Sequence, residues 1–257
     1  MTQIEGIYEL EIANTKVFII EGSKNLLVDT GSGPTHDEVL AFMEKSGLKF
    51  DNEALRKLMK QGAYQTIIDF LTQQNIKLDT IICTHCHEDH TGNVKKLKET
   101  LKVTVAMHPD DVPYVEGTKE VPPPAFIPPE ILKHTKVEPC KVDVLLQDGE
   151  FITPDVQVIH VEGHTKGSIC LLYKNQALIV GDCLVGKNER NPMMGPNELN
   201  PPIEMFSMDH EQALKSLQRL LNYDFSAILT CHGTSIMKNG KEKLEKLLKD
   251  INRLPGY

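Results

Sequence analysis

The stretch Thr84-His85-Cys86-His87-Glu88-Asp89-His90-Thr91-Gly92 holds four potential metal ligands within six residues, in the pattern H-x-H-x-D-H. It directly follows an apolar run that has the length of a buried strand. Alternation along an extended chain places His85 and His87 on the same side, so both imidazoles can reach one cation. Asp89 and His90 lie where the chain turns into a helix, and they can address a second position nearby. Because imidazole and carboxylate groups suit zinc, iron or manganese, the segment predicts a metal site.

Three more candidate ligands each follow an apolar, strand-like run elsewhere in the chain. His164 comes after the run that ends at Val161, Asp182 follows residues 177–180, and His232 follows residues 226–230. The carboxyl ends of strands in α/β folds converge on one crevice, so these side chains can meet the cluster. Together the seven candidates supply five histidines and two aspartates, enough for two metal ions with an open position.

A competing motif overlaps the cluster. Cys83-Thr84-His85-Cys86-His87 also matches C-x-x-C-H, the pattern of c-type haem attachment. Haem attachment normally requires export, and residues 1–16 lack the basic flank and apolar stretch of a secretory signal. Six cysteines without such a signal predict free thiols in a reducing, cytoplasmic compartment. Cys86, Cys183 and Cys231 adjoin proposed ligands, and we expect them to be packing residues and not ligands.

The motifs resemble those of the metallo-β-lactamase superfamily, which has an aspartate after an early strand, then H-x-H-x-D-H, then separated His, Asp and His. The matching positions run from Asp29 to His232 and cover most of the chain. The resemblance implies an α/β fold, namely a four-layer αββα sandwich with a dinuclear metal site at one edge. It implies two ligand sets, which are His85, His87 and His164 for one metal ion and Asp89, His90 and His232 for the other. By the same resemblance, Asp182 bridges both ions and Asp29 orients the cluster from outside it.

The chain is expected to form one domain over residues 1–257, with a Pro-rich insertion at about 109–139. Eight of the fifteen prolines fall in that insertion, which excludes a continuous helix and leaves room for one helical turn near residues 130–133. Strands precede helices in each half, which favours two packed sheets with helices outside. The predicted strands are 4–11, 17–20, 26–28, 79–84, 103–107, 142–146, 156–161, 169–173, 177–180 and 226–230. The predicted helices are 36–45, 53–60, 64–74, 93–100, 209–222 and 241–252.

The amino-acid composition limits the classes of partner that the protein is expected to bind. The chain has 28 Lys and Arg against 36 Asp and Glu, and a surface with a net charge of −8 repels nucleic-acid phosphates. No run approaches 18 apolar residues, so no membrane-spanning helix is expected. The expected partner is a small-molecule substrate, and assembly into a homo-oligomer stays open.

The chemistry expected of two neighbouring divalent ions is hydrolysis, with zinc in the first place and iron or manganese as alternatives. Two cations lower the pKa of a bridging water, and the hydroxide attacks an acyl or phosphoryl centre that one metal polarises. Asp89 is expected to orient the hydroxide and move its proton. The predicted function is cleavage of a small ester, thioester or lactone. The alternative is a mononuclear iron oxidoreductase that resembles the persulfide dioxygenases of the superfamily.

Differences between this sequence and particular branches of the superfamily narrow the expected substrate class. The bridging Asp182 argues against the true β-lactamases, and the pattern is closer to glyoxalase II and to the lactonases. Glyoxalase II continues after its last ligand into a helical domain that holds glutathione, whereas 25 residues follow His232 here. Glutathione thioesters are therefore expected to be poor substrates. The similar lactonases carry a tyrosine three residues after the bridging aspartate, where this chain has Val185.

Two long loops, 109–139 and 186–202, are expected to wall the pocket, since long ordered loops often cover active sites. The expected apolar contacts are Met193, Met194, Phe126 and Ile127, and Lys187 or Arg190 is expected near any substrate carboxylate.

Overall fold

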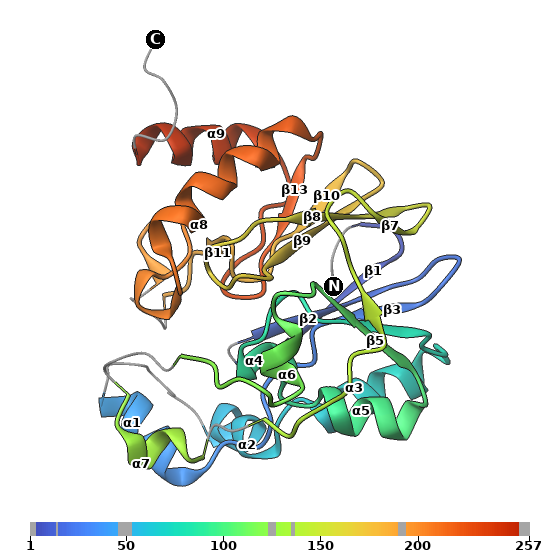
Figure 1. Ribbon diagram of the computed structural model, residues 1–257, viewed down its shortest axis with the longest axis vertical. Coiled ribbons are helices and arrows are strands. Elements are labelled where there is room, and N and C mark those ends of the chain that lie inside the picture. The colour runs from blue at the N-terminus through green and yellow to red at the C-terminus, as the bar shows by residue number, and fades with distance from the viewer. Residues whose placement is uncertain are drawn as a thin grey trace.

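The computed structural model describes residues 4–13, 15–45, 53–122, 127–134, 137–189 and 194–251. Two main sheets face each other, with helices on both outer sides (Figure 1). One small two-stranded sheet, formed by β11 (Val185–Gly186) and β12 (Leu199–Asn200), lies apart from them.

The first sheet has six strands in chain order. They are β1 (Ile7–Ile12), β2 (Thr15–Ile20), β3 (Leu26–Val28), β4 (Thr80–Ile82), β5 (Thr104–Met107) and β6 (Val144–Leu145). The pairs from β1 to β3 are antiparallel, and those from β3 to β6 are parallel. Parallel pairing requires long crossovers, and helices lie within all three crossovers of this sheet.

The second sheet has five strands in the order β13 (Ala227–Leu229), β10 (Ala177–Ile179), β9 (Ile169–Tyr173), β8 (Val156–His160) and β7 (Phe151–Thr153). Strand β9 runs antiparallel to both β8 and β10, and β13 is parallel to β10. Strands β8, β10 and β13 therefore point the same way and end at the same edge of the sheet.

The helices flank the sheets and the connections. They are α1 (Asp37–Lys45), α2 (Glu53–Gln61), α3 (Tyr64–Gln73), α4 (Glu88–Thr91), α5 (Val94–Leu101), α6 (Val112–Val115), α7 (Pro129–Leu132), α8 (His210–Ser216) and α9 (Gly240–Asp250). The short 3₁₀ helices are η2 (Glu204–Phe206) and η3 (Leu217–Asn222). Within the described ranges, no helix is both long and apolar enough to cross a bilayer.

Strand alternation builds three apolar layers and therefore four layers of structure. In β2, Val17 and Ile19 face α3 and α5, while Phe18 and Ile20 face the second sheet. In β9, Leu171 faces the first sheet and Leu172 faces the α8, η3 and α9 side. All of these side chains are almost fully buried. The predicted αββα sandwich is confirmed.

Most predicted elements are present, with three differences. The Pro-rich segment contains α6 as well as the expected turn at α7, and each has a proline in its first turn, where a missing N–H costs nothing. The helix predicted over 209–222 changes to 3₁₀ geometry at Leu217. Strands β7, β11 and β12 are too short to show a clear alternation, and the sequence did not predict them.

Candidate metal centre

All seven predicted ligands meet at one edge of the sandwich. Strand β4 ends just before the loop that carries His85 and His87, and α4 carries Asp89 and His90. In the second sheet, the segments that follow β8, β10 and β13 deliver the other three ligands, which are His164, Asp182 and His232. The shared direction of these three strands explains why residues so distant in sequence converge.

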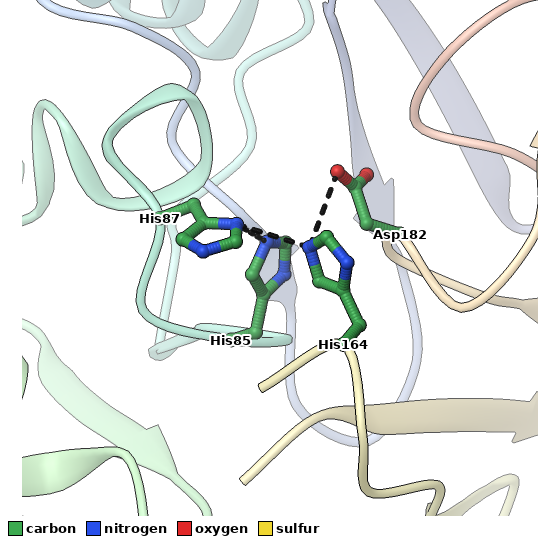
Figure 2. Close-up of side chains that lie close together, drawn as sticks. All are labelled: His85, His87, His164 and Asp182. Atoms are coloured by element: carbon green, nitrogen blue, oxygen red, sulfur yellow. Dashed lines mark hydrogen bonds and ion pairs between the residues drawn. The ribbon is translucent and has the colours of Figure 1, made fainter. Parts of the chain in front are cut away.

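The first group of ligand atoms comes from three imidazoles and one carboxylate (Figure 2). His87 Nδ1 lies 3.1 Å from His85 Nε2 and 3.0 Å from His164 Nε2. Asp182 Oδ2 lies 3.6 Å from His164 Nε2. Three ring nitrogens therefore point at a common position beside a carboxylate oxygen.

The second group lies on the other side of Asp182. Its Oδ1 is 3.2 Å from His90 Nε2 and 3.3 Å from His232 Nε2. Asp89 Oδ2 completes this group, at 3.1 Å from His232 Nε2 and 3.8 Å from His90 Nε2. Asp182 thus presents one oxygen to each group.

Hydrogen bonds outside the groups fix which nitrogen each ring turns inward. His90 Nδ1 lies 2.7 Å from Asp29 Oδ2 and donates its proton there, which leaves Nε2 as a lone pair. Thr84 gives its single hydroxyl proton to Asp29, so its oxygen accepts from His85 Nδ1 at 3.1 Å. In the same way, Ser207 donates to a backbone carbonyl and accepts from His164 Nδ1 at 3.2 Å. Each of these three rings therefore offers Nε2 to the centre.

The electrostatics of the two groups differ. Burial lowers the pKa of His164 to about 3, and it also holds the pKa values of His85 and His87 below the usual range, so these rings stay neutral. Burial acts the same way on His232, but the carboxylates of Asp182 and Asp89 raise its pKa to about 10. In the first group, nitrogens of neutral imidazoles lie about 3 Å apart, and a cation between them would relieve this crowding. In the second group, the carboxylates that attract protons would also attract a metal ion.

Two buried atoms test whether metal ions fit. His90 Nε2 and Asp182 Oδ1 are buried, and neither has a hydrogen-bond partner within the described part of the chain. They lie 3.2 Å apart without the alignment of a hydrogen bond. A buried polar atom without a partner is costly, and a cation between these two would satisfy both. The donor set of five imidazoles and two carboxylates fits a pair of divalent ions such as zinc, iron or manganese.

A sequence model of the metallo-beta-lactamase superfamily matches residues 13–232, which include every candidate ligand. The chain belongs to the metallo-beta-lactamase superfamily.

Several known proteins are similar to this chain over half of its length or more. A probable metallo-hydrolase of Bacillus subtilis, YflN, is 30% identical over 70% of this chain and 73% of its own length. A hydroxyacylglutathione hydrolase of Francisella philomiragia is 28% identical over 52% of this chain, and the match spans half of that relative's length. A solved metallo-beta-lactamase family protein from Thermus thermophilus superposes with a TM-score of 0.67 over 98% of this chain and 81% of its own, at 19% identity. That likeness shows the fold.

A large cavity opens onto the metal centre of this superfamily member. Its volume is about 1080 Å³, and His87, Asp89, Asp182 and His232 form part of its wall. Of the residues expected to wall the pocket, Ile127 and Met194 do line it, while Met193, Phe126 and Arg190 lie outside the described residues. Lys187 does not line it and pairs instead with Glu189 at 3.3 Å.

Three residues that orient the candidate ligands were not predicted from the sequence, namely Thr84, Ser207 and Asp111. Asp111 is fully buried and accepts hydrogen bonds from Thr165 Oγ1 at 2.6 Å and from Gly167 N at 2.8 Å. It therefore anchors the loop that carries His164. The only sequence signal for Asp111 is its place just after the end of a predicted strand.

Replacing Asp29 with asparagine should weaken metal binding by roughly 10–100-fold, as is typical when a partner of a ligating histidine is changed. Asp29 accepts from His90 Nδ1 and from the Thr84 amide, and asparagine keeps its size but turns one acceptor into a donor. Its φ of 62° is also tolerated by asparagine, so the backbone is preserved. Zinc affinity, measured by competition with a chelator, checks the prediction.

Asp143→Asn is the matched control, because Asp143 also accepts from a backbone amide and a side chain but lies just before the edge strand β6 and belongs to neither ligand group. This variant should keep wild-type zinc affinity. Equal affinity in the two variants would show that Asp29 does not orient the centre.

Proposed function

We propose that this protein is a hydrolase that holds two divalent metal ions, zinc in the first place, and cleaves a small ester, thioester or lactone. The observation that carries the proposal is the division of Asp182 between the two groups, with Oδ2 toward His164 and Oδ1 toward His90 and His232. A carboxylate placed in this way can bridge two cations.

When bound, two such ions supply a water molecule of lowered pKa and polarise the carbonyl of the substrate. The protein's own residues set the geometry around that reaction. Burial would raise the pKa of Asp89, but the imidazoles of His90 and His232 hold it below its usual range. Asp89 therefore stays ionised, and its side chain, 31% exposed at the cavity wall, would be able to accept a hydrogen bond from a water held by the metal ions.

The similar proteins support the hydrolytic class. YflN is named a probable metallo-hydrolase, and other matched relatives are named hydroxyacylglutathione hydrolases. These names support hydrolysis as the reaction class. The chemical nature of the substrate is inferred from the cavity.

Metal analysis combined with an oxygen measurement tests the proposal. Protein purified without added metal should contain two zinc ions per chain, hydrolyse at least one member of an ester, thioester and lactone panel, and consume no oxygen with glutathione persulfide. One iron ion per chain together with oxygen uptake would favour the oxidoreductase and overturn the proposal.

Glutathione thioesters should be poor substrates of this enzyme. Glutathione carries two carboxylates, and the described basic side chains of the cavity wall, apart from ligands, are Lys119 and Lys133, which are exposed, and His134, which pairs with Glu38. Such a wall offers little to bind the remote part of the substrate and position its carbonyl. We expect kcat/KM for S-lactoylglutathione to fall at least tenfold below that for a small aryl ester. A value near 10⁵ M⁻¹s⁻¹ or above, roughly that of a good enzyme–substrate pair, would contradict the prediction.

A further inference from the structure

The cavity does not end at the metal centre. From His87 and Asp182 it continues between α1, α7 and the segment 203–208, and its volume of about 1080 Å³ is at the upper end of the range for small-molecule pockets. Three separate parts of the chain thus form one extended wall next to the proposed reaction site.

The side chains on this wall are mostly apolar. Helix α1 supplies Val39, Phe42 and Met43, α7 supplies Ile131 and Leu132, and the segment 203–208 supplies Ile203, Met205, Phe206 and Met208. Of these, Val39, Phe42 and Ile131 belong to none of the described apolar layers of the sandwich. All three line the cavity, and Val39 and Ile131 are largely buried beside it.

Helices α1 and α7 form one unit although more than 80 residues separate them. They lie side by side, outside the four layers (Figure 1). The ring of His134, just after α7, lies against that of His36 at a tilt of 36° with centroids 4.5 Å apart, and it pairs with Glu38. Two insertions between strands of the first sheet thus hold each other in place over the cavity.

Away from the metal centre, the cavity wall offers no buried cation to a strongly anionic occupant. Among its described residues, the lysines are Lys119 and Lys133, both exposed, and no arginine lines the cavity. A carboxylate or phosphate deep in this space would lose water without gaining a buried cation, which is costly. An apolar chain, by contrast, gains free energy with each methylene that it buries.

We propose that the substrate carries an apolar chain of several carbons, which lies between α1, α7 and residues 203–208 while its carbonyl lies at the metal centre. This inference rests on the proposed hydrolase function. It makes Phe42 and Ile131 specificity-determining residues that contact the chain and not the reacting atoms.

Two measurements test whether the protein selects substrates by the length of their apolar chain. The first is kcat/KM of the zinc-loaded enzyme for p-nitrophenyl esters from acetate to decanoate, where the leaving group is constant. We expect a rise of roughly fourfold for each added methylene until the cavity is filled. The second is calorimetric binding of straight-chain alkanoates from butyrate to decanoate, which requires no turnover and should strengthen along the series with a negative heat-capacity change.

Variants locate the chain. Phe42→Ser and Ile131→Ser should each flatten both series for the longer members, and Phe42→Leu should restore most of the slope. Phe151→Ser is the matched control, because Phe151 is 59% exposed on β7 and lies outside the cavity wall. Its slopes should equal those of the wild type.

The outcomes separate the two proposals. Hydrolysis that does not depend on chain length, together with alkanoate binding that does not depend on it, overturns the apolar chain while the hydrolase stands. If alkanoate binding strengthens with chain length but no ester is hydrolysed, the apolar site is supported and the proposed hydrolase function is overturned. Equal slopes in Phe42→Ser, Ile131→Ser and Phe151→Ser overturn the proposed location of the chain.

Discussion

Replacing His87 with alanine should remove most of the metal from the first ligand group and lower kcat/KM by roughly a thousandfold, or about 4 kcal/mol. His87 Nδ1 lies within 3.1 Å of the nitrogens of both His85 and His164, so it is central to that group. Removing it leaves His85, His164 and an oxygen of Asp182, a set with one ligand fewer that should bind a divalent ion much more weakly. Metal content by mass spectrometry and steady-state kinetics with the best ester of the panel measure the effect.

The neighbouring Cys86 provides the matched control. Cys86 is 3% exposed and packs in the apolar layer beneath the first sheet, and burial raises the pKa of its thiol, so it stays protonated. Cys86→Ala should cost about 1 kcal/mol of stability and leave metal content near the wild-type value. Full metal content and turnover in His87→Ala would overturn the ligand assignment, and equal metal loss in both variants would point to a folding defect.

The seven candidate ligands, which the fold brings together, could be recognised in the sequence because their signals are local. His85, His87, Asp89 and His90 follow one strand within six residues, and His164, Asp182 and His232 each follow a strand of their own. Strand ends are visible as the end of an apolar run, and strands that share a direction bring their ends together.

The residues that orient the candidate ligands could not be predicted from the sequence, because the residues that they contact are remote in sequence. Ser207 lies 43 residues from His164, and Asp111 lies 54 residues from Thr165. Isolated serines and aspartates in loops are common, and nothing in the local pattern distinguishes these from solvated ones. Asp29 was found only through the family resemblance, and its three partners, Thr84, His90 and Cys231, became visible in the folded chain.

The wall of the cavity was predicted only in part, because it too depends on contacts between residues that are remote in sequence. The density of prolines marked 109–139 as irregular, but it did not show that α7 packs against α1. The periodicity of α1 predicted a helix but not which element its apolar side chains face. Contacts between two insertions depend on where the sandwich places their ends, and a local pattern does not contain that information.

Replacing Asp182 with asparagine should affect both ligand groups at once, which no other single ligand change should do. The two oxygens of Asp182 are divided between the groups, so the variant loses the negative charge that both positions share. It also places an amide donor beside His164 or His90, where a cation would have to bind. We expect metal content to fall below one ion per chain and kcat/KM to fall by roughly a thousandfold or more.

His232→Ala is the comparison that gives this result its meaning. His232 contacts Asp89 and Asp182 in the second group, and no described contact joins it to His85 or His87. This variant should therefore keep about one ion per chain, held by the three imidazoles of the first group together with Asp182 Oδ2, and zinc titration should show a single tight site. If Asp182→Asn also kept one tightly bound ion, Asp182 would belong to one group alone, and the bridging role that supports a two-metal hydrolase would be wrong.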